Sequence, residues 1–108
     1  MTNLPVPIAA YLGAANADDT VALAACFTAD PVVHDEARKY RGIEAIVAWK
    51  AETNARYHPF VEARRIEGAD PEYRLYAIVS GDFPGSPAML AYSFILCGDR
   101  IASLEIGV

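Results

Sequence analysis

The segment from Phe27 to Trp49, FTADPVVHDEARKYRGIEAIVAW, narrows the choice of fold more than any other part of the chain. It predicts the end of one helix, a short strand over Pro31 to Asp35, and a Tyr40-Arg41-Gly42 turn that opens the next helix. Asp35 therefore stands where an apolar strand ends, with aromatic residues nearby in the sequence. In a small α+β domain, this is one way to place an acid or a base at the mouth of a cavity.

Two helices are expected before this strand and a third after it. Apolar residues at helical spacing indicate the first over Pro5 to Ala15 and the second from about Asp19 to Phe27. Asp18 or Asp19 can cap the second helix by accepting from its free N–H groups. The third should cover Gly42 to Arg56, because His58-Pro59 ends its pattern. Apolar or alternating runs between Gly- and Pro-containing turns predict four more strands, over Phe60 to Glu67, Glu72 to Ser80, Ala88 to Cys97 and Ile101 to Val108.

This order of elements predicts an α+β fold. Consecutive strands with short links form an antiparallel meander, and three helices gathered at the start of the chain must cover one face of its sheet. The length of 108 residues fits a single domain over residues 1–108. The loop from Gly81 to Pro87 is rich in Gly and Pro, and it is either a lid for a cavity or a wide hairpin without a role.

The charge balance argues against two classes of partner. The chain carries nine basic and fourteen acidic residues, a net charge of -5. Nucleic acids and anionic membranes both attract basic surfaces, and the one local basic pair, Arg64-Arg65, lies between Glu62 and Glu67. No apolar run approaches the ~20 residues of a membrane span. We therefore expect a cytoplasmic protein that binds neither nucleic acid nor membrane.

Apolar residues make up 54% of the chain, which in so short a sequence suggests an interface or an apolar cavity. Cys26 and Cys97 form no CxxC pair and are expected to be buried reduced thiols, although a disulfide stays open. No spacing among the histidines and acidic residues places three metal ligands together. The sequence therefore predicts neither a metal nor another cofactor.

Three stretches carry a family resemblance: AYLGAANADDTVALAACFTADPVVHD near the start, YRGIEAI at the third helix, and RIASLEIGV at the end. With the order of elements, they make nearly the whole chain resemble the nuclear transport factor 2-like superfamily, and within it the SnoaL-like polyketide cyclase and ketosteroid isomerase group. The resemblance implies a cone-shaped, cystatin-like α+β roll, in which a strongly curved, mixed or antiparallel sheet wraps three N-terminal helices around a deep cavity. It also implies a homodimer packed through the outer face of the sheet.

The resemblance suggests roles for three residues. Ketosteroid isomerases place a base at the end of the first strand, where this chain has Asp35, and use a tyrosine of the first helix as a hydrogen-bond donor, where it has Tyr11. Their second donor is a carboxylic acid on the penultimate strand. This chain has Ala91-Tyr92-Ser93 there, so Tyr92 is the candidate substitute.

Each of these residues also has an ordinary structural interpretation. Asp35 is either a base whose pKa an apolar cavity raises or a solvated strand-end carboxylate. Tyr11 is either an oxyanion donor or a core tyrosine. Because neighbouring strand residues face opposite ways, His34 should point outward if Asp35 points inward, and a shift of one residue would exchange them. Six further residues either line a pocket for ligand or fill the core: Phe27, Trp49, Tyr57, Phe60, Phe94 and Leu104.

Two functions of different classes follow. The first is a cofactor-free acid–base enzyme of the isomerase, cyclase or dehydratase type, acting on a small apolar or cyclic molecule in the cavity. The second is a non-catalytic ligand-binding or accessory dimer of the same fold. A dimerisation module with a cavity closed by side chains is a third possibility. A fold alone does not choose among them.

Overall fold

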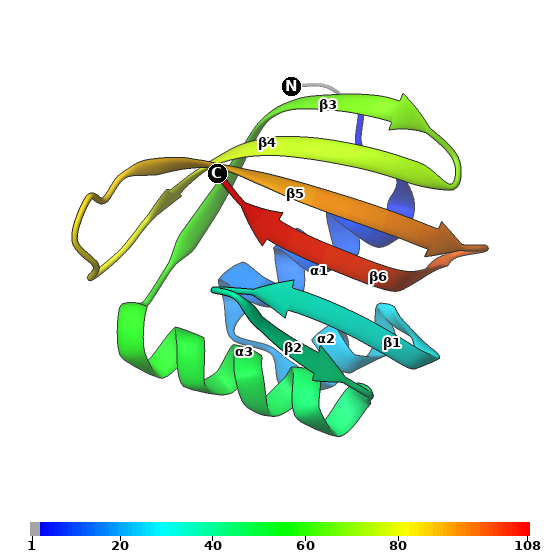
Figure 1. Ribbon diagram of the computed structural model, residues 1–108, viewed down its shortest axis with the longest axis horizontal. Coiled ribbons are helices and arrows are strands. Elements are labelled where there is room, and N and C mark those ends of the chain that lie inside the picture. The colour runs from blue at the N-terminus through cyan, green and yellow to red at the C-terminus, as the bar shows by residue number, and fades with distance from the viewer. Residues whose placement is uncertain (1–2) are drawn as a thin grey trace.

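Three helices and one six-stranded sheet form the protein, as the computed structural model describes it for residues 3–108 (Figure 1). The helices are α1 (Val6–Ala17), α2 (Thr20–Ala25) and α3 (Ile43–Tyr57). The strands are β1 (Phe27–Asp35), β2 (Arg38–Arg41), β3 (Phe60–Ala69), β4 (Glu72–Ser80), β5 (Ala88–Cys97) and β6 (Arg100–Gly107). The order of strands in the sheet is β2-β1-β6-β5-β4-β3.

The sheet is mixed, and it remains open. β1 pairs in parallel with β6, whereas every other neighbouring pair is antiparallel. The long strands β3 to β6 curve over α1, while α3 lies along the β1–β2 end of the sheet (Figure 1). The parallel pairing brings the end of β1 beside the last strand of the chain. The predicted α+β class, with helices packed in a mixed sheet, is confirmed.

The helix ends follow local chemistry. Asp19 caps α2 by accepting from the N–H of Ala22 at 3.0 Å, as one of the two predicted caps. Asp18 instead ends α1 in the left-handed conformation. α3 begins after Gly42 and ends at His58, whose φ is 46°. The helix boundaries therefore lie within a few residues of the predicted ones.

The second helix ends slightly before the predicted position at about Phe27. α2 ends at Ala25, and Phe27 already begins β1. Asp30 and Pro31 lie within this strand, not at a helix boundary. A proline is tolerated there because the pairing of β1 with β6 is irregular between Phe27 and Val32, so no regular ladder hydrogen bond is lost.

The sequence analysis also missed a strand. The residues read as a turn before the third helix form β2, which pairs with β1 through a two-residue connection of Glu36 and Ala37. Both have positive φ, 52° and 62°, as a tight hairpin of this type requires. Gly, Asn or Asp usually occupies such positions. A Glu-Ala pair does not belong to these residue types, so nothing in the sequence indicated the hairpin.

The core lies between the helices and the inner face of the sheet. Its fully buried side chains come from both layers: Ile8, Tyr11, Leu23, Val33, Ile46, Leu75, Phe94, Ile101 and Leu104. The ring of Tyr11 meets the rings of Phe27 and Phe94 edge to face, with centroids 6.2 and 5.8 Å away. These contacts hold α1 against β1 and β5. The position of α1 therefore limits how far the cavity described below can extend into the fold.

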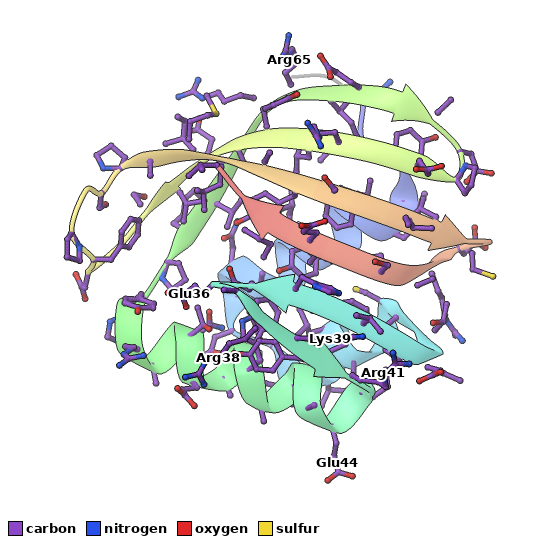
Figure 2. All side chains as sticks on the ribbon, in the orientation of Figure 1. Glu36, Arg38, Lys39, Arg41, Glu44 and Arg65 are labelled. Carbon is purple, nitrogen blue, oxygen red and sulfur yellow. The ribbon has the colours of Figure 1, made fainter. Side chains whose placement is uncertain are left out.

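Charged residues occupy both edges of the sheet. Arg38, Lys39 and Arg41 lie along the edge strand β2, and Arg65 lies on the opposite edge strand β3 (Figure 2). All four are exposed. Charged side chains on an edge discourage pairing with strands of other molecules, which suits an open sheet.

The two cysteines differ in environment. Both are free, and Cys26 is buried, with its thiol 3.3 Å from the carbonyl oxygen of Ala22. Cys97 is exposed, so the expectation of two buried thiols is wrong for this residue. It follows the last inward-facing residue of β5, and alternation turns it outward.

Candidate functional site

A cavity of about 380 Å³ opens where α3, the loop 81–87 and the ends of several strands meet. Most of its wall is apolar, and only a few polar groups reach it. Its lining residues are Asp35, Glu36, Trp49, Lys50, Thr53, Tyr57, Pro59, Val61, Val79, Phe83, Pro84, Ala88, Leu90, Tyr92 and Ile106. A concave apolar site with a few convergent polar groups is the usual form of a small-molecule site.

Two other hollows are larger and chemically poorer. One of about 730 Å³ lies between β2 and α3, and is lined by exposed charged residues such as Glu52 and Arg56. The other, of about 500 Å³, lies over β4 to β6 on the outer face of the sheet. Both present mainly solvated side chains. We therefore take the smaller, apolar cavity as the candidate site.

Asp35 is the acidic group at the centre of this site. It ends β1, is partly buried, and lines the cavity, while its neighbour His34 is exposed. The Trp49 indole N–H donates to Asp35 Oδ2 at 3.0 Å. Burial raises the pKa of Asp35 above its ordinary value, and the charge of Glu36 adds to this. The Trp49 hydrogen bond and Lys50 act in the opposite direction without cancelling the rise.

Tyr92 supplies a neutral hydroxyl to the same cavity. It is buried on β5 and stacks on Phe94, with ring centroids 6.3 Å apart. Burial raises the pKa of Tyr92 strongly, and the charge of Asp35 raises it further. The phenol therefore keeps its proton at neutral pH and can act only as a hydrogen-bond donor or acceptor there.

Tyr11 lies behind this wall. Its side chain is 1% exposed and does not belong to the cavity lining. Burial raises the pKa of Tyr11 well above its ordinary value, with smaller contributions from Tyr92 and Asp35. Tyr11 therefore lies close enough to Tyr92 and Asp35 for their charges to affect its pKa, but its ring is packed among the aromatic residues of the core.

Lys50 is the functional candidate that the sequence analysis missed. In the sequence it lies on the same side of the third helix as the apolar residues Ile43, Ile46 and Val47. In the structure it is 6% exposed and lines the cavity, with Nζ 5.5 Å from the centre of the Trp49 ring. Burial lowers the pKa of Lys50, and the charges of Asp35 and Asp18 oppose that change. A lysine on an otherwise apolar helical stripe was the sign available in the sequence.

The predicted aromatic and aliphatic lining divides into three groups. Trp49 and Tyr57 line the cavity. Phe27, Phe94 and Leu104 are buried in the core and do not reach it. Phe60 is 55% exposed at the start of β3 and lies outside the lining, because alternation directs the next residue, Val61, inward instead.

The loop 81–87 forms one wall of the cavity. The N–H of Asp82 donates to the carbonyl of Tyr57 at 2.6 Å, and the Asp82 carboxylate lies 3.0 Å from Nδ1 of His58. The ring of Phe83 meets that of Tyr57 edge to face, with centroids 6.1 Å apart. The loop is therefore fastened to the end of α3, beside the polar groups of the site.

Within residues 3–108, no three His, Cys, Asp or Glu side chains lie close enough to hold a metal ion. Nor does that part of the chain contain a helix long and apolar enough to cross a membrane.

Comparison with solved structures places this architecture in a family. A proposed polyketide cyclase from Sinorhizobium meliloti is 37% identical, with a TM-score of 0.92 over 95% of this chain and 94% of that one. The chain belongs to the nuclear transport factor 2-like, SnoaL-like superfamily. No family model and none of the curated proteins compared matches this sequence, so the assignment depends on the solved structures.

Two more structures illustrate the range of this superfamily. A protein with a ketosteroid isomerase-like fold from Catenulispora acidiphila, in complex with trimethylamine, is 25% identical, with a TM-score of 0.86 over 98% of this chain and 87% of that one. A nuclear transport factor 2-like protein of unknown function from Cytophaga hutchinsonii is 11% identical, with a TM-score of 0.78 over 98% of this chain and 92% of that one, and shows the fold alone.

Proposed function

We propose that this protein is a cofactor-free enzyme that moves a proton on a small apolar or cyclic molecule held in the cavity. The reaction would be of the isomerase, cyclase or dehydratase type. One observation carries the proposal: the Asp35 carboxylate reaches an apolar cavity, and one of its oxygens accepts the Trp49 indole N–H at 3.0 Å. A carboxylate held in this way is oriented to accept a proton.

The environment of Asp35 suits a general base. An ordinary aspartate is a weak base at neutral pH, and burial strengthens it by raising its pKa. Removing a proton from a carbon next to a carbonyl moves an electron pair onto the carbonyl oxygen. The hydroxyl of Tyr92 is a neutral donor in the cavity wall that can stabilise this oxygen. Tyr11 would contribute only by supporting the wall from behind.

The size and walls of the cavity limit the substrate. A space of about 380 Å³ holds one small cyclic molecule rather than a polymer. Val61, Val79, Leu90 and Ile106 give it an apolar lining. The similarity to a proposed polyketide cyclase and to a ketosteroid isomerase-like protein supports the same class of ring-containing substrates.

A non-catalytic ligand-binding role is the second candidate. The observation that favours it is the Catenulispora acidiphila relative, which was solved in complex with a small molecule, trimethylamine. A binding protein needs the cavity but no proton transfer. It would therefore keep ligand affinity and show no turnover with any substrate.

The decisive experiment is an isomerisation assay with β,γ-unsaturated cyclic ketones, followed by the absorbance of the conjugated product. We expect Asp35→Asn to lower turnover by about 10²- to 10⁴-fold, the contribution typical of a general base. The matched control is Asp30→Asn, which removes an exposed carboxylate from the same strand. Turnover that survives in Asp35→Asn would rule out this assignment, and binding without turnover in the wild-type protein would favour the second candidate.

We also propose that the protein is a homodimer through the outer face of the sheet. Met89 and Ile95 are 50% and 43% exposed on the outward side of β5, with Ala91 between them. Apolar side chains in this position favour burial against a second copy. Met89→Lys should convert the dimer to a monomer in sedimentation experiments. A wild-type protein that sediments as a monomer at all concentrations would exclude the proposal.

A further inference from the structure

We propose that Lys50 is the group that binds the ligand, and that it selects molecules with a carboxylate, enolate or carbonyl oxygen. The inference rests on the proposed function only in placing the ligand in this cavity. It adds a second polar contact, on α3, to the Asp35 carboxylate on β1. It also narrows the substrate from an apolar molecule to an apolar molecule with an oxygen facing Lys50.

The burial of Lys50 is the first argument. Its side chain is 6% exposed, and lysines are rarely so buried unless they are paired. Within residues 3–108, however, Lys50 makes no side-chain hydrogen bond and no ion pair. Nζ is not among the fully buried polar atoms without a partner, so the ammonium of this otherwise buried side chain keeps some accessible surface, and a ligand oxygen in the cavity can pair with it.

The charge pattern of the cavity is the second argument. Among the described residues that line it, Lys50 is the only basic one. An ammonium has three N–H donors and no acceptor, so it requires an oxygen or an aromatic face. The Trp49 ring offers such a face, 5.5 Å from Nζ. The Trp49 N–H, in turn, is donated to Asp35. The donors of Lys50 that remain are therefore available to a ligand.

This arrangement also fits the proton transfer. When a C–H bond next to the carbonyl of a ketone breaks, the proton goes to Asp35. The electron pair of the C–H bond forms a C=C bond, and the pair of the C=O π bond moves onto the oxygen, which gives an enolate. Asp35 is then neutral and the enolate negative, so the negative charge has moved from the carboxylate to the ligand. A protonated Lys50 stabilises that charge without giving up its proton, and the apolar wall strengthens the attraction. Return of the proton from Asp35 to another carbon completes the reaction.

A binding experiment can test the inference without a known substrate. The probes are cyclohexanecarboxylate and its neutral analogue cyclohexanecarboxamide, which differ little in shape. Trp49 is the only tryptophan in the chain and lines the cavity, so its fluorescence reports binding at this site. We expect the wild-type protein to bind the carboxylate about 10- to 100-fold more tightly, the range for a charge-assisted hydrogen bond.

The chain offers a matched control. Lys39 is the only other lysine, and it is exposed on the edge strand β2 (Figure 2). Lys50→Met should abolish the preference for the carboxylate, whereas Lys39→Met, with the same loss of charge, should retain it. Lys50→Arg should restore part of the preference and guards against a folding defect in Lys50→Met. Equal preference in Lys50→Met and wild type, or no preference in wild type, would overturn the inference.

A fourth variant separates this inference from the proposed catalysis. Asp35→Asn removes a negative charge that repels the carboxylate probe, so it should tighten carboxylate binding while abolishing turnover. Turnover that persists in Asp35→Asn would refute the base assignment and leave the role of Lys50 intact. Loss of turnover in Asp35→Asn together with unchanged probe selectivity in Lys50→Met would refute the role of Lys50 alone.

Discussion

Replacement of Trp49 by phenylalanine tests the central contact of the site. The substitution removes the indole N–H that donates to Asp35 Oδ2 at 3.0 Å, but it keeps a ring against Tyr40, whose centroid lies 5.8 Å away. The hydrogen bond stabilises only the ionised carboxylate. Its loss leaves burial and the charge of Glu36 opposed only by Lys50 and by the backbone hydrogen bond from Glu36, so the pKa of Asp35 should rise further.

The magnitude follows from the type of bond. A hydrogen bond to a charged group contributes about 1.5–3 kcal/mol to stability. Because the pKa of Asp35 is raised in the folded protein, ionisation of this group lowers the free energy of unfolding as pH rises from the ordinary aspartate range through the folded value. Trp49→Phe should deepen that fall by about 1.5–3 kcal/mol. Below the ordinary aspartate pKa, where the carboxyl is protonated in both states, this difference should vanish.

Two measurements check the reasoning. Carboxyl ¹³C NMR titration follows the pKa of Asp35, with Asp35→Asn identifying its resonance. Urea unfolding of both proteins over a range of pH separates the loss of ring volume, which does not depend on pH, from the loss of the hydrogen bond, which does. In the Asp35→Asn background, Trp49→Phe should lose its pH-dependent part. An Asp35 pKa that stays constant or falls in Trp49→Phe would refute the reasoning.

Two further predictions concern stability, and a third concerns ligand binding. Ala37→Gly should raise the free energy of unfolding by about 1 kcal/mol, because Ala37 has a φ of 62°, where glycine is not strained. Ala51→Gly, on the exposed face of α3, should instead lower it by about 1 kcal/mol, because glycine disfavours a helix. Thermal unfolding measures both changes. Asp35→Asn should stabilise the protein more at neutral than at acid pH, because burial opposes ionisation of the wild-type carboxyl and raises its pKa. Urea unfolding at both values checks this. Gly81→Ala should loosen the loop 81–87 and weaken binding of the cyclohexanecarboxylate probe, because the new Cβ would lie 2.6 Å from the carbonyl oxygen of Tyr57. Titration followed by Trp49 fluorescence measures the affinity of the probe. An unchanged affinity would contradict this prediction.

The parts of the fold that were predicted correctly depend on local patterns. Helical spacing and the Asp19 cap located α2, and turn residues located the ends of the four strands of the meander. β2 was not predictable in this way, because the Glu36–Ala37 connection adopts positive φ without glycine or asparagine. The pairing of β1 with β6 overrides the local effect of Pro31, and no short-range pattern records a partner that lies about 70 residues away.

The site was predictable where strand alternation applies. Alternation predicted only that His34 and Asp35 face opposite ways and left open which of them points inward; in the structure His34 is exposed and Asp35 is partly buried. The same rule applied from Val61 would have placed Phe60 outside. It could not separate Phe94 from Tyr92, which share a face, because the cavity begins only where α1 ceases to cover the sheet.

Lys50 shows why the chemistry of the site depends on the whole fold. A lysine on α3 would be a solvated residue if β3 to β5 and the loop 81–87 did not enclose the cavity that it lines. The same closure partly buries Asp35, so one structural feature acts on both groups in opposite directions. It raises the pKa of the acid and lowers that of the base. Asp35 and Lys50 lie on different elements, so the sequence does not reveal this coupling. The charge of each group limits the pKa shift of the other. This mutual effect favours the charged forms of both groups in one apolar cavity.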